Sequence, residues 1–170
     1  MSDYSSDSLT LREAFKDANL SGKTALLLSS WFGVGLMPLA PGTFGALAAV
    51  PLIIIIKYFG VVHIGICLIV LIPMAVWTSQ IAQELLGKND PSEVVIDEVA
   101  GLFLAVLLIP LSWFNFILAF LLFRMFDILK PFPIGMIDRS IKGGAGIVLD
   151  DLVAGIYANL CIRIITVIFS

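Results

Sequence analysis

Charged side chains are scarce in this sequence. Only 14% of its 170 residues are Asp, Glu, Lys or Arg, whereas 59% are hydrophobic, and the mean hydropathy is +1.05. Soluble domains carry about 25% charged residues, so this composition excludes an ordinary soluble domain and indicates a membrane protein. The net charge of −3 also argues against nucleic acid as a partner.

Histidine and cysteine are nearly absent. The single histidine, His63, excludes the membrane phosphatases that need two catalytic histidines. Cys67 and Cys161 lie in apolar segments, so we expect them to pack rather than to form a disulfide framework. Neither is followed six residues later by the arginine of thiol phosphatases, and the Asp-x-Asp motif of aspartyl-phosphate enzymes is missing from the sequence.

Three long stretches have no charge: 24–56, 58–83 and 99–123. A helix rises about 1.5 Å per residue, so each can cross a hydrocarbon layer of about 30 Å. We therefore expect an all-α fold, a polytopic integral membrane helical bundle with hairpin helices, in which residues 23–170 form a single membrane-embedded domain. Ser, Gly and Pro interrupt residues 25–40, and this segment either spans the membrane or re-enters it.

Residues 1–22 are predicted to form a polar tail and an interfacial amphipathic helix. Thr10 and Glu13 have the spacing of a capping box, and apolar residues follow on one helical face. The acidic start of the chain does not fit a secretory signal peptide.

Turn and capping residues predict a first helical hairpin. Thr43 is expected to cap a helix over residues 44–58. A tight connection at Phe59 and Gly60 then leads into a second helix over residues 61–86.

A second hairpin is predicted further along the chain. Asp90, followed by Pro91 at N1, predicts the start of a helix that runs to about residue 109. Pro110 favours a turn there, because proline inside a helix costs about 3 kcal/mol. The chain then returns through residues 116–126, and the last helix is predicted to start near Ile147.

This arrangement places most basic residues on one side of the membrane. By the positive-inside rule that side is cytoplasmic, so we predict a multi-pass membrane protein with its charged cluster facing the cytoplasm. The expected cytoplasmic residues are Lys23, Lys88, Arg124, Lys130, Arg139 and Lys142, with Lys57, Pro110 and Arg163 toward the opposite face.

Acidic and basic residues from four segments should meet at the cytoplasmic face. Carboxylates held together repel one another unless a cation neutralises them, and oxygen ligands suit Mg²⁺ or Mn²⁺. Arginine and lysine in the same cluster complement phosphate oxygens. The mixture predicts a metal-assisted site for a phosphate that protrudes from lipid. Its members are Asp97, Glu98, Arg124, Asp127, Lys130, Asp138, Lys142, Asp150 and Asp151.

Other interpretations of these residues remain open. The acidic pairs at helix starts could serve only the helix dipole. Asp138 and Arg139 either join the site or only solvate their loop, and the glycines of residues 143–146 form either a phosphate nest or a linker. Small residues below the acidic pairs, such as Gly101 and Gly155, should allow another helix or a ligand to approach closely.

Four ordered motifs carry a family resemblance. They are Pro41-Gly42-Thr43-Phe44-Gly45-Ala46-Leu47-Ala48-Ala49, Asp97-Glu98-Val99-Ala100-Gly101, Phe123-Arg124-x-x-Asp127-x-x-Lys130-Pro131-x-Pro133-Ile134, and Gly143-Gly144-x-Gly146-Ile147-x-x-Asp150-Asp151-x-x-Ala154-Gly155. From about Trp31 to the C-terminus, the chain closely resembles the phosphatidylglycerophosphatase A family.

The resemblance implies Mg²⁺-dependent hydrolysis of phosphatidylglycerophosphate, a phospholipid of the bilayer, to phosphatidylglycerol and phosphate, in the bacterial inner membrane. It implies that metal ligands or water-activating bases are Asp97, Glu98, Asp127, Asp150 and Asp151. It also implies phosphate binding by Arg124 and Lys130, with Thr43 and Lys142 as further candidates. Two other classes are compatible with the composition, a cation or proton transporter that uses paired carboxylates and a non-catalytic membrane subunit. The oligomeric state stays open.

Overall fold

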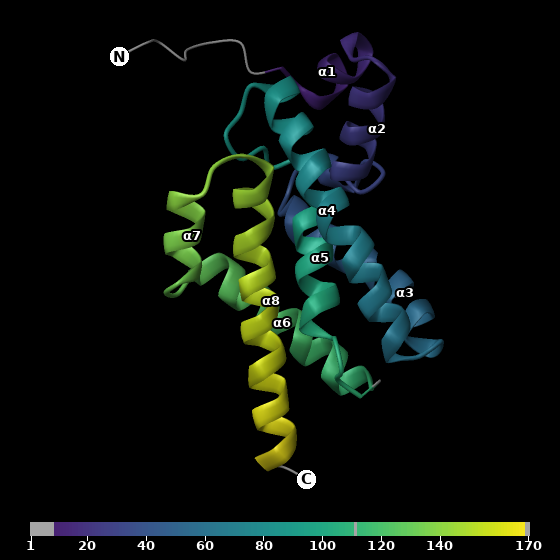
Figure 1. Cartoon of the computed structure of the whole chain (residues 1–170), viewed down its shortest axis with the longest axis vertical. Helices are drawn as coiled ribbons and strands as arrows, with labels where there is room; N and C mark the ends of the chain where they lie inside the picture. The colour runs from purple at the N-terminus through teal and green to yellow at the C-terminus, as the bar shows by residue number, and fades with distance from the viewer. Residues whose placement is uncertain (1–8, 111, 169–170) are drawn as a thin grey trace.

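The computed structural model describes residues 9–110 and 112–168. Within these ranges the chain is helical and contains no β-strand (Figure 1). Residues 1–8 of the predicted polar tail lie outside the described residues. The elements are α1 (Leu11–Asp17), α2 (Leu20–Ser29), the 3₁₀ helix η1 (Val34–Leu36), α3 (Pro41–Tyr58), α4 (Val61–Leu86), α5 (Ile96–Ala105), α6 (Trp113–Leu129), α7 (Ile134–Ser140) and α8 (Gly143–Ile168).

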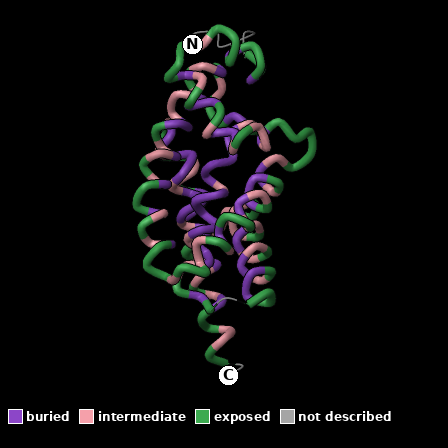
Figure 2. The backbone as a smooth tube through the Cα atoms, turned by 90° about the vertical axis from the view of Figure 1, so that its right-hand side faces the viewer, coloured by how far each residue is buried: buried purple, intermediate pink, exposed green. Residues whose placement is uncertain are grey.

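Three helices, α3, α4 and α8, are long and apolar enough to cross a membrane. Buried residues follow the inside of the bundle, whereas exposed residues cover its outer faces (Figure 2). Many of the exposed side chains are large and apolar, such as Ile55, Ile69 and Ile117. A helix bundle that is apolar inside and outside suits lipid as its surroundings. The predicted all-α membrane bundle is confirmed.

Helix α5 lies at the centre of the bundle and packs against α3, α4, α6 and α8. Eight of its ten residues are buried. Its backbone meets that of α8 at Gly101 and Gly155, where a Cβ built on Gly155 would overlap the carbonyl oxygen of Gly101. The predicted close approach at these small residues is therefore present.

Side chains from α3 and α8 bind the carbonyl groups at the end of α5. Asn159 Nδ2 donates to three carbonyl oxygens there, the shortest bond being 2.6 Å to Leu107. Lys57 Nζ donates to the carbonyl of Val106 at 2.8 Å. The last carbonyls of a helix lack partners within it, and no water satisfies them in lipid, so these bonds are needed. They also place Lys57 at the predicted end of the bundle, beside the turn at Pro110.

The two hairpins are confirmed, although some helix ends differ from those predicted. Helix α3 begins at Pro41, with Ala40 as its N-cap, so the prediction that Thr43 caps it is wrong. Helix α5 begins at Ile96 rather than just after Asp90, because residues 91–94 form a turn and the Val95 N–H donates to the Ser29 carbonyl.

The last helix begins at Gly143, four residues before the predicted start. The Gly144 N–H donates to Gln80 Oε1 at 2.7 Å, so α4 caps α8 across 64 residues of sequence. The predicted loop before it contains α7. Such tertiary caps leave no local signal in the sequence.

The N-terminal segments lie at the upper end of the bundle in Figure 1. Thr10 and Glu13 form the predicted capping box of α1. Helix α2 has 10 residues, so it is about 15 Å long and too short to cross a membrane. Tight turns at Trp31 and Phe32 and then η1 follow it. The segment over residues 25–40 therefore does not span as one helix.

Candidate active site

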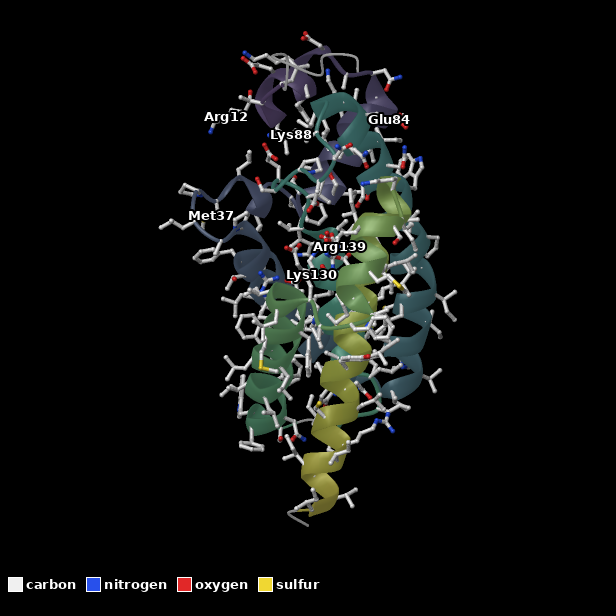
Figure 3. All side chains as sticks on the ribbon, turned by 90° about the vertical axis from the view of Figure 1, so that its left-hand side faces the viewer. Arg12, Met37, Glu84, Lys88, Lys130 and Arg139 are labelled. Atoms are coloured by element: carbon white, nitrogen blue, oxygen red, sulfur yellow. The ribbon has the colours of Figure 1, made fainter. Side chains whose placement is uncertain are left out.

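Three helices begin, and two end, around a polar cavity of about 270 Å³. The N-termini of α3, α5 and α8 meet there with the C-termini of α6 and α7. In Figure 3, the label of Lys130 marks this region. Helix N-termini carry unpaired N–H groups and partial positive charge, so they attract anions. Their convergence gives the cavity a field that suits a phosphate.

Five carboxylates expected at the site come together. They form two groups of three residues. Within each group, one carboxylate oxygen from each residue lies within 4.8 Å of those of the other two, and Asp151 belongs to both groups. One group comprises Asp97, Glu98 and Asp151, and the other comprises Asp127, Asp150 and Asp151. Asp97, Asp150 and Asp151 are buried, although buried carboxylates are costly unless they are paired or bind a cation.

Two basic side chains lie among these carboxylates. Arg124 Nη1 is 2.7 Å from Asp127 Oδ2 and 3.7 Å from Glu98 Oε1. Lys130 Nζ donates to Asp138 and Asp150, each at 2.7 Å. Burial by itself would lower the pKa of the Lys130 ammonium, but the hydrogen bonds to the two aspartates outweigh it and hold that pKa above its usual value. Lys130 is therefore a fixed positive charge in the cavity wall.

These two cations leave negative charge uncompensated. Glu98 Oε2 and Asp150 Oδ1 are buried and have no hydrogen-bond partner among the residues that the structure describes. An all-oxygen set of several carboxylates is what Mg²⁺ and Mn²⁺ prefer. The residues present therefore fit a divalent cation, and they are the five acidic residues assigned from the sequence.

The remaining predicted residues occupy different places. Lys142 is exposed and lines the cavity. Thr43 is half-buried in the first turn of α3 and is not among the lining residues, so its role stays a prediction. Asp138 joins the cavity through Lys130, whereas the Arg139 Nε donates to the Gly135 carbonyl of its own helix.

Position 42, in the first motif, requires glycine because no side chain fits there. A Cβ built on Gly42 would overlap the carboxylate of Glu98 and crowd the guanidinium of Arg124. The start of α3 therefore packs directly on the site, through its glycine rather than through Thr43.

The sequence prediction missed a polar wall of the cavity. Asn89, Asp90 and Ser92, from the segment between α4 and α5, line it. From the sequence, Asp90 is predicted only to cap a helix. The signal that could identify the segment is that residues 88–93 are polar except for Pro91, in a chain that is otherwise so apolar.

Known proteins resemble this chain over most of its length. Residues 27–166 match the family model described as Phosphatidylglycerophosphatase A. A Haemophilus influenzae protein named Phosphatidylglycerophosphatase A is 40% identical over 138 residues, which cover 80% of this chain and 85% of that protein. An Escherichia coli protein of the same name is 36% identical over 137 residues, which cover 76% of each chain.

A third relative has a different name. A Bacteroides thetaiotaomicron protein, provisionally named as a phosphatidylinositol-3-phosphatase, is 35% identical over 147 residues, which cover 82% of this chain and 91% of that protein. The search of solved structures found no match. The family model and these relatives show that the chain is a phosphatase and belongs to the phosphatidylglycerophosphatase A family.

Proposed function

We propose that the protein hydrolyses phosphatidylglycerophosphate to phosphatidylglycerol and inorganic phosphate, with Mg²⁺ as cofactor, as a step of glycerophospholipid synthesis. The observation that carries the proposal is the meeting of five carboxylates with Arg124 and Lys130 at the N-termini of three helices. Two relatives named for this activity support the choice of lipid.

The residues that would hold Mg²⁺ are Asp97, Glu98, Asp127, Asp150 and Asp151. Bound there, the ion would act as a Lewis acid that stabilises negative charge on the phosphate oxygens. Arg124 and Lys130 would add positive charge on the same oxygens, Arg124 through its planar fork.

A carboxylate of the cavity would take a proton from the attacking water. Glu98 Oε2 and Asp150 Oδ1 have no hydrogen-bond partner among the described residues, so either could accept it. The water oxygen bonds to phosphorus and the bond from phosphorus to the glycerol oxygen breaks. That oxygen takes the proton that the carboxylate had accepted from the water, so the alcohol leaves neutral and the carboxylate is restored. The N-termini of α3, α5 and α8 favour the anionic phosphate throughout.

We infer that the protein lies in the inner membrane of a bacterium and that its cavity faces the cytoplasm. In Figure 3, Arg12 and Lys88 lie near the upper end of the molecule and Lys130 and Arg139 lie near its middle, so none of the four is in its lower part. An excess of basic residues on one side marks the cytoplasmic side. The phosphate would thus enter from the water side while the acyl chains of the lipid stay in the bilayer.

The name of the Bacteroides relative raises a second lipid, a phosphoinositide. Both lipids carry a phosphate monoester on the alcohol of a head group, so the chemistry would be the same. A membrane transporter is not favoured, because the carboxylates gather where α3 and α5 begin and α6 ends rather than near the middle of the long helices, where transport sites occur.

Phosphate release by the purified protein tests the proposal. We expect release from phosphatidylglycerophosphate in detergent with Mg²⁺, little from phosphatidylinositol 3-phosphate, and none after chelation by EDTA. Asp151→Asn is the inactive control. Release from the phosphoinositide alone would overturn the proposed substrate, and undiminished release in EDTA would overturn the proposed cofactor.

A further inference from the structure

The segment between α4 and α5, residues 88–95, forms one wall of the cavity. Asn89, Asp90 and Ser92 face the cavity that the carboxylates and Lys130 share. The reaction described above assigns no task to these three side chains.

An ion pair within the segment and a hydrogen bond to α2 hold it in place. Lys88 Nζ forms an ion pair with Glu93 Oε1 at 2.5 Å, which closes the segment on itself. The Val95 N–H donates to the Ser29 carbonyl at 2.8 Å, which ties the segment to the end of α2. A wall fixed in this way can present polar groups at set positions.

Asp90 has neither of the roles expected for an acidic residue here. It does not cap α5, which begins at Ile96. It belongs to neither carboxylate group that could hold a metal ion. Asp90 is exposed at the mouth of the cavity, and among the described residues its carboxylate has no hydrogen bond or ion pair, so it is free to accept one from a ligand. Lys130, Asp138 and Asp127 are close enough to influence it electrostatically.

We propose that Asn89, Asp90 and Ser92 form a subsite for the free hydroxyl group of the head-group alcohol, with Asp90 as its main hydrogen-bond acceptor. This inference rests on the proposed function. A carboxylate repels phosphate oxygens but accepts a hydrogen bond from an alcohol, and Asn and Ser side chains both donate and accept, as an alcohol does. With the phosphate among Lys130, Arg124 and the metal ligands, the rest of the head group reaches this wall.

A site built to bind a hydroxyl group selects against analogues that lack it. The matched pair of substrates is phosphatidylglycerophosphate and its deoxy analogue, in which CH₂ replaces the CHOH of the terminal glycerol. We expect wild-type kcat/KM to be about tenfold or more lower for the deoxy analogue, because the hydrogen bond is to a charged acceptor.

The variants Asp90→Ala and Ser92→Ala complete the comparison. Asp90→Ala should lower kcat/KM for the natural head group by a similar factor and leave that for the deoxy analogue nearly unchanged. Ser92→Ala should act in the same direction with a smaller effect. Asp17→Ala, in an exposed position of α1 away from the cavity, is the control and should change neither. Equal use of both substrates by the wild type, or an equal loss for both in Asp90→Ala, would overturn the subsite.

A binding measurement separates this proposal from the proposed reaction. Calorimetric titration with Mg²⁺ present compares glycerol 3-phosphate with 3-hydroxypropyl phosphate, which lacks the middle hydroxyl. Tighter binding of glycerol 3-phosphate by the wild type, with no such preference in Asp90→Ala, supports the subsite. It does so even if phosphatidylglycerophosphate is not hydrolysed, because that failure would contradict the proposed function and not the subsite. Equal affinity of the wild type for the two ligands would sink the subsite.

Discussion

Gly101 of α5 and Gly155 of α8 lie in direct backbone contact, one turn of helix beyond the acidic residues that each helix contributes to the site. This contact sets how closely α5 approaches α8. The distance between Asp97 and Asp151 therefore depends on two residues that have no side chain.

Gly155→Ala should separate these helices, because its Cβ would overlap the Gly101 carbonyl oxygen. Crowding of this kind costs about 1–3 kcal/mol, so we expect a lower Tm and a weaker response to Mg²⁺. Gly65→Ala in α4 is the matched control, since a Cβ there meets nothing within 4 Å. Thermal unfolding and Mg²⁺ titrations of both variants measure the difference. Equal behaviour of the two would show that the contact does not control the site.

Asp151→Asn should nearly abolish turnover while the protein still folds and inserts. The change keeps the size of the side chain but removes a charge shared by both carboxylate groups. Asp138→Asn should be milder, because Lys130 keeps its second partner, Asp150. The measurement is phosphate release against Mg²⁺ concentration. Near-normal release by Asp151→Asn at ordinary Mg²⁺ would remove α8 from the proposed metal site.

Arg124→Lys should weaken use of the substrate and leave the Mg²⁺ dependence intact. Lysine keeps the positive charge beside Asp127 and Glu98 but loses the planar fork with which arginine can bind two phosphate oxygens. We expect a fall of about ten- to a hundredfold in kcat/KM, or roughly 1.4–2.7 kcal/mol. Rescue of Asp151→Asn but not of Arg124→Lys by excess Mg²⁺ would support the division of roles. Rescue of both would contradict it.

Asn159→Leu should loosen the end of α5 that is opposite the site. The change removes the donor that three carbonyl oxygens share, and hydrogen bonds between membrane helices contribute about 0.6–2 kcal/mol. The control is Tyr157→Phe, which removes a single hydrogen bond from the same helix to the Phe132 carbonyl. We expect Asn159→Leu to have the lower Tm of the two. Thermal unfolding in detergent checks this. A smaller loss in Asn159→Leu than in Tyr157→Phe would be the contrary result.

Single-cysteine labelling tests the orientation of the bundle. After replacement of Cys67 and Cys161, a cysteine at Lys142 should label from the cytoplasm and one at Ser112 from the opposite side. The structure places these residues at opposite ends, because Lys142 lines the cavity whereas Ser112 caps α6 at the other end of that helix. Reversed labelling of the pair would overturn the proposed cytoplasmic site.

The sequence by itself determined the membrane bundle, its two hairpins and the identity of the charged cluster. Long uncharged stretches have few stable forms other than spanning helices, since lipid leaves no partner for open backbone groups. A few charges in so apolar a chain then mark the site, and Asp97, Glu98, Arg124, Asp127, Lys130, Asp150 and Asp151 were identified in this way.

Only the tertiary structure decided where some helices begin and which further residues reach the cavity. Asp90, Pro91 and Glu93 have every local feature of a helix start, but the bond from Val95 to Ser29 delays α5 to Ile96 and leaves Asp90 facing the cavity. Gln80 likewise sets the start of α8 from a distant helix. Local propensity contributes only tenths of a kcal/mol per residue, so a single long-range contact can override it.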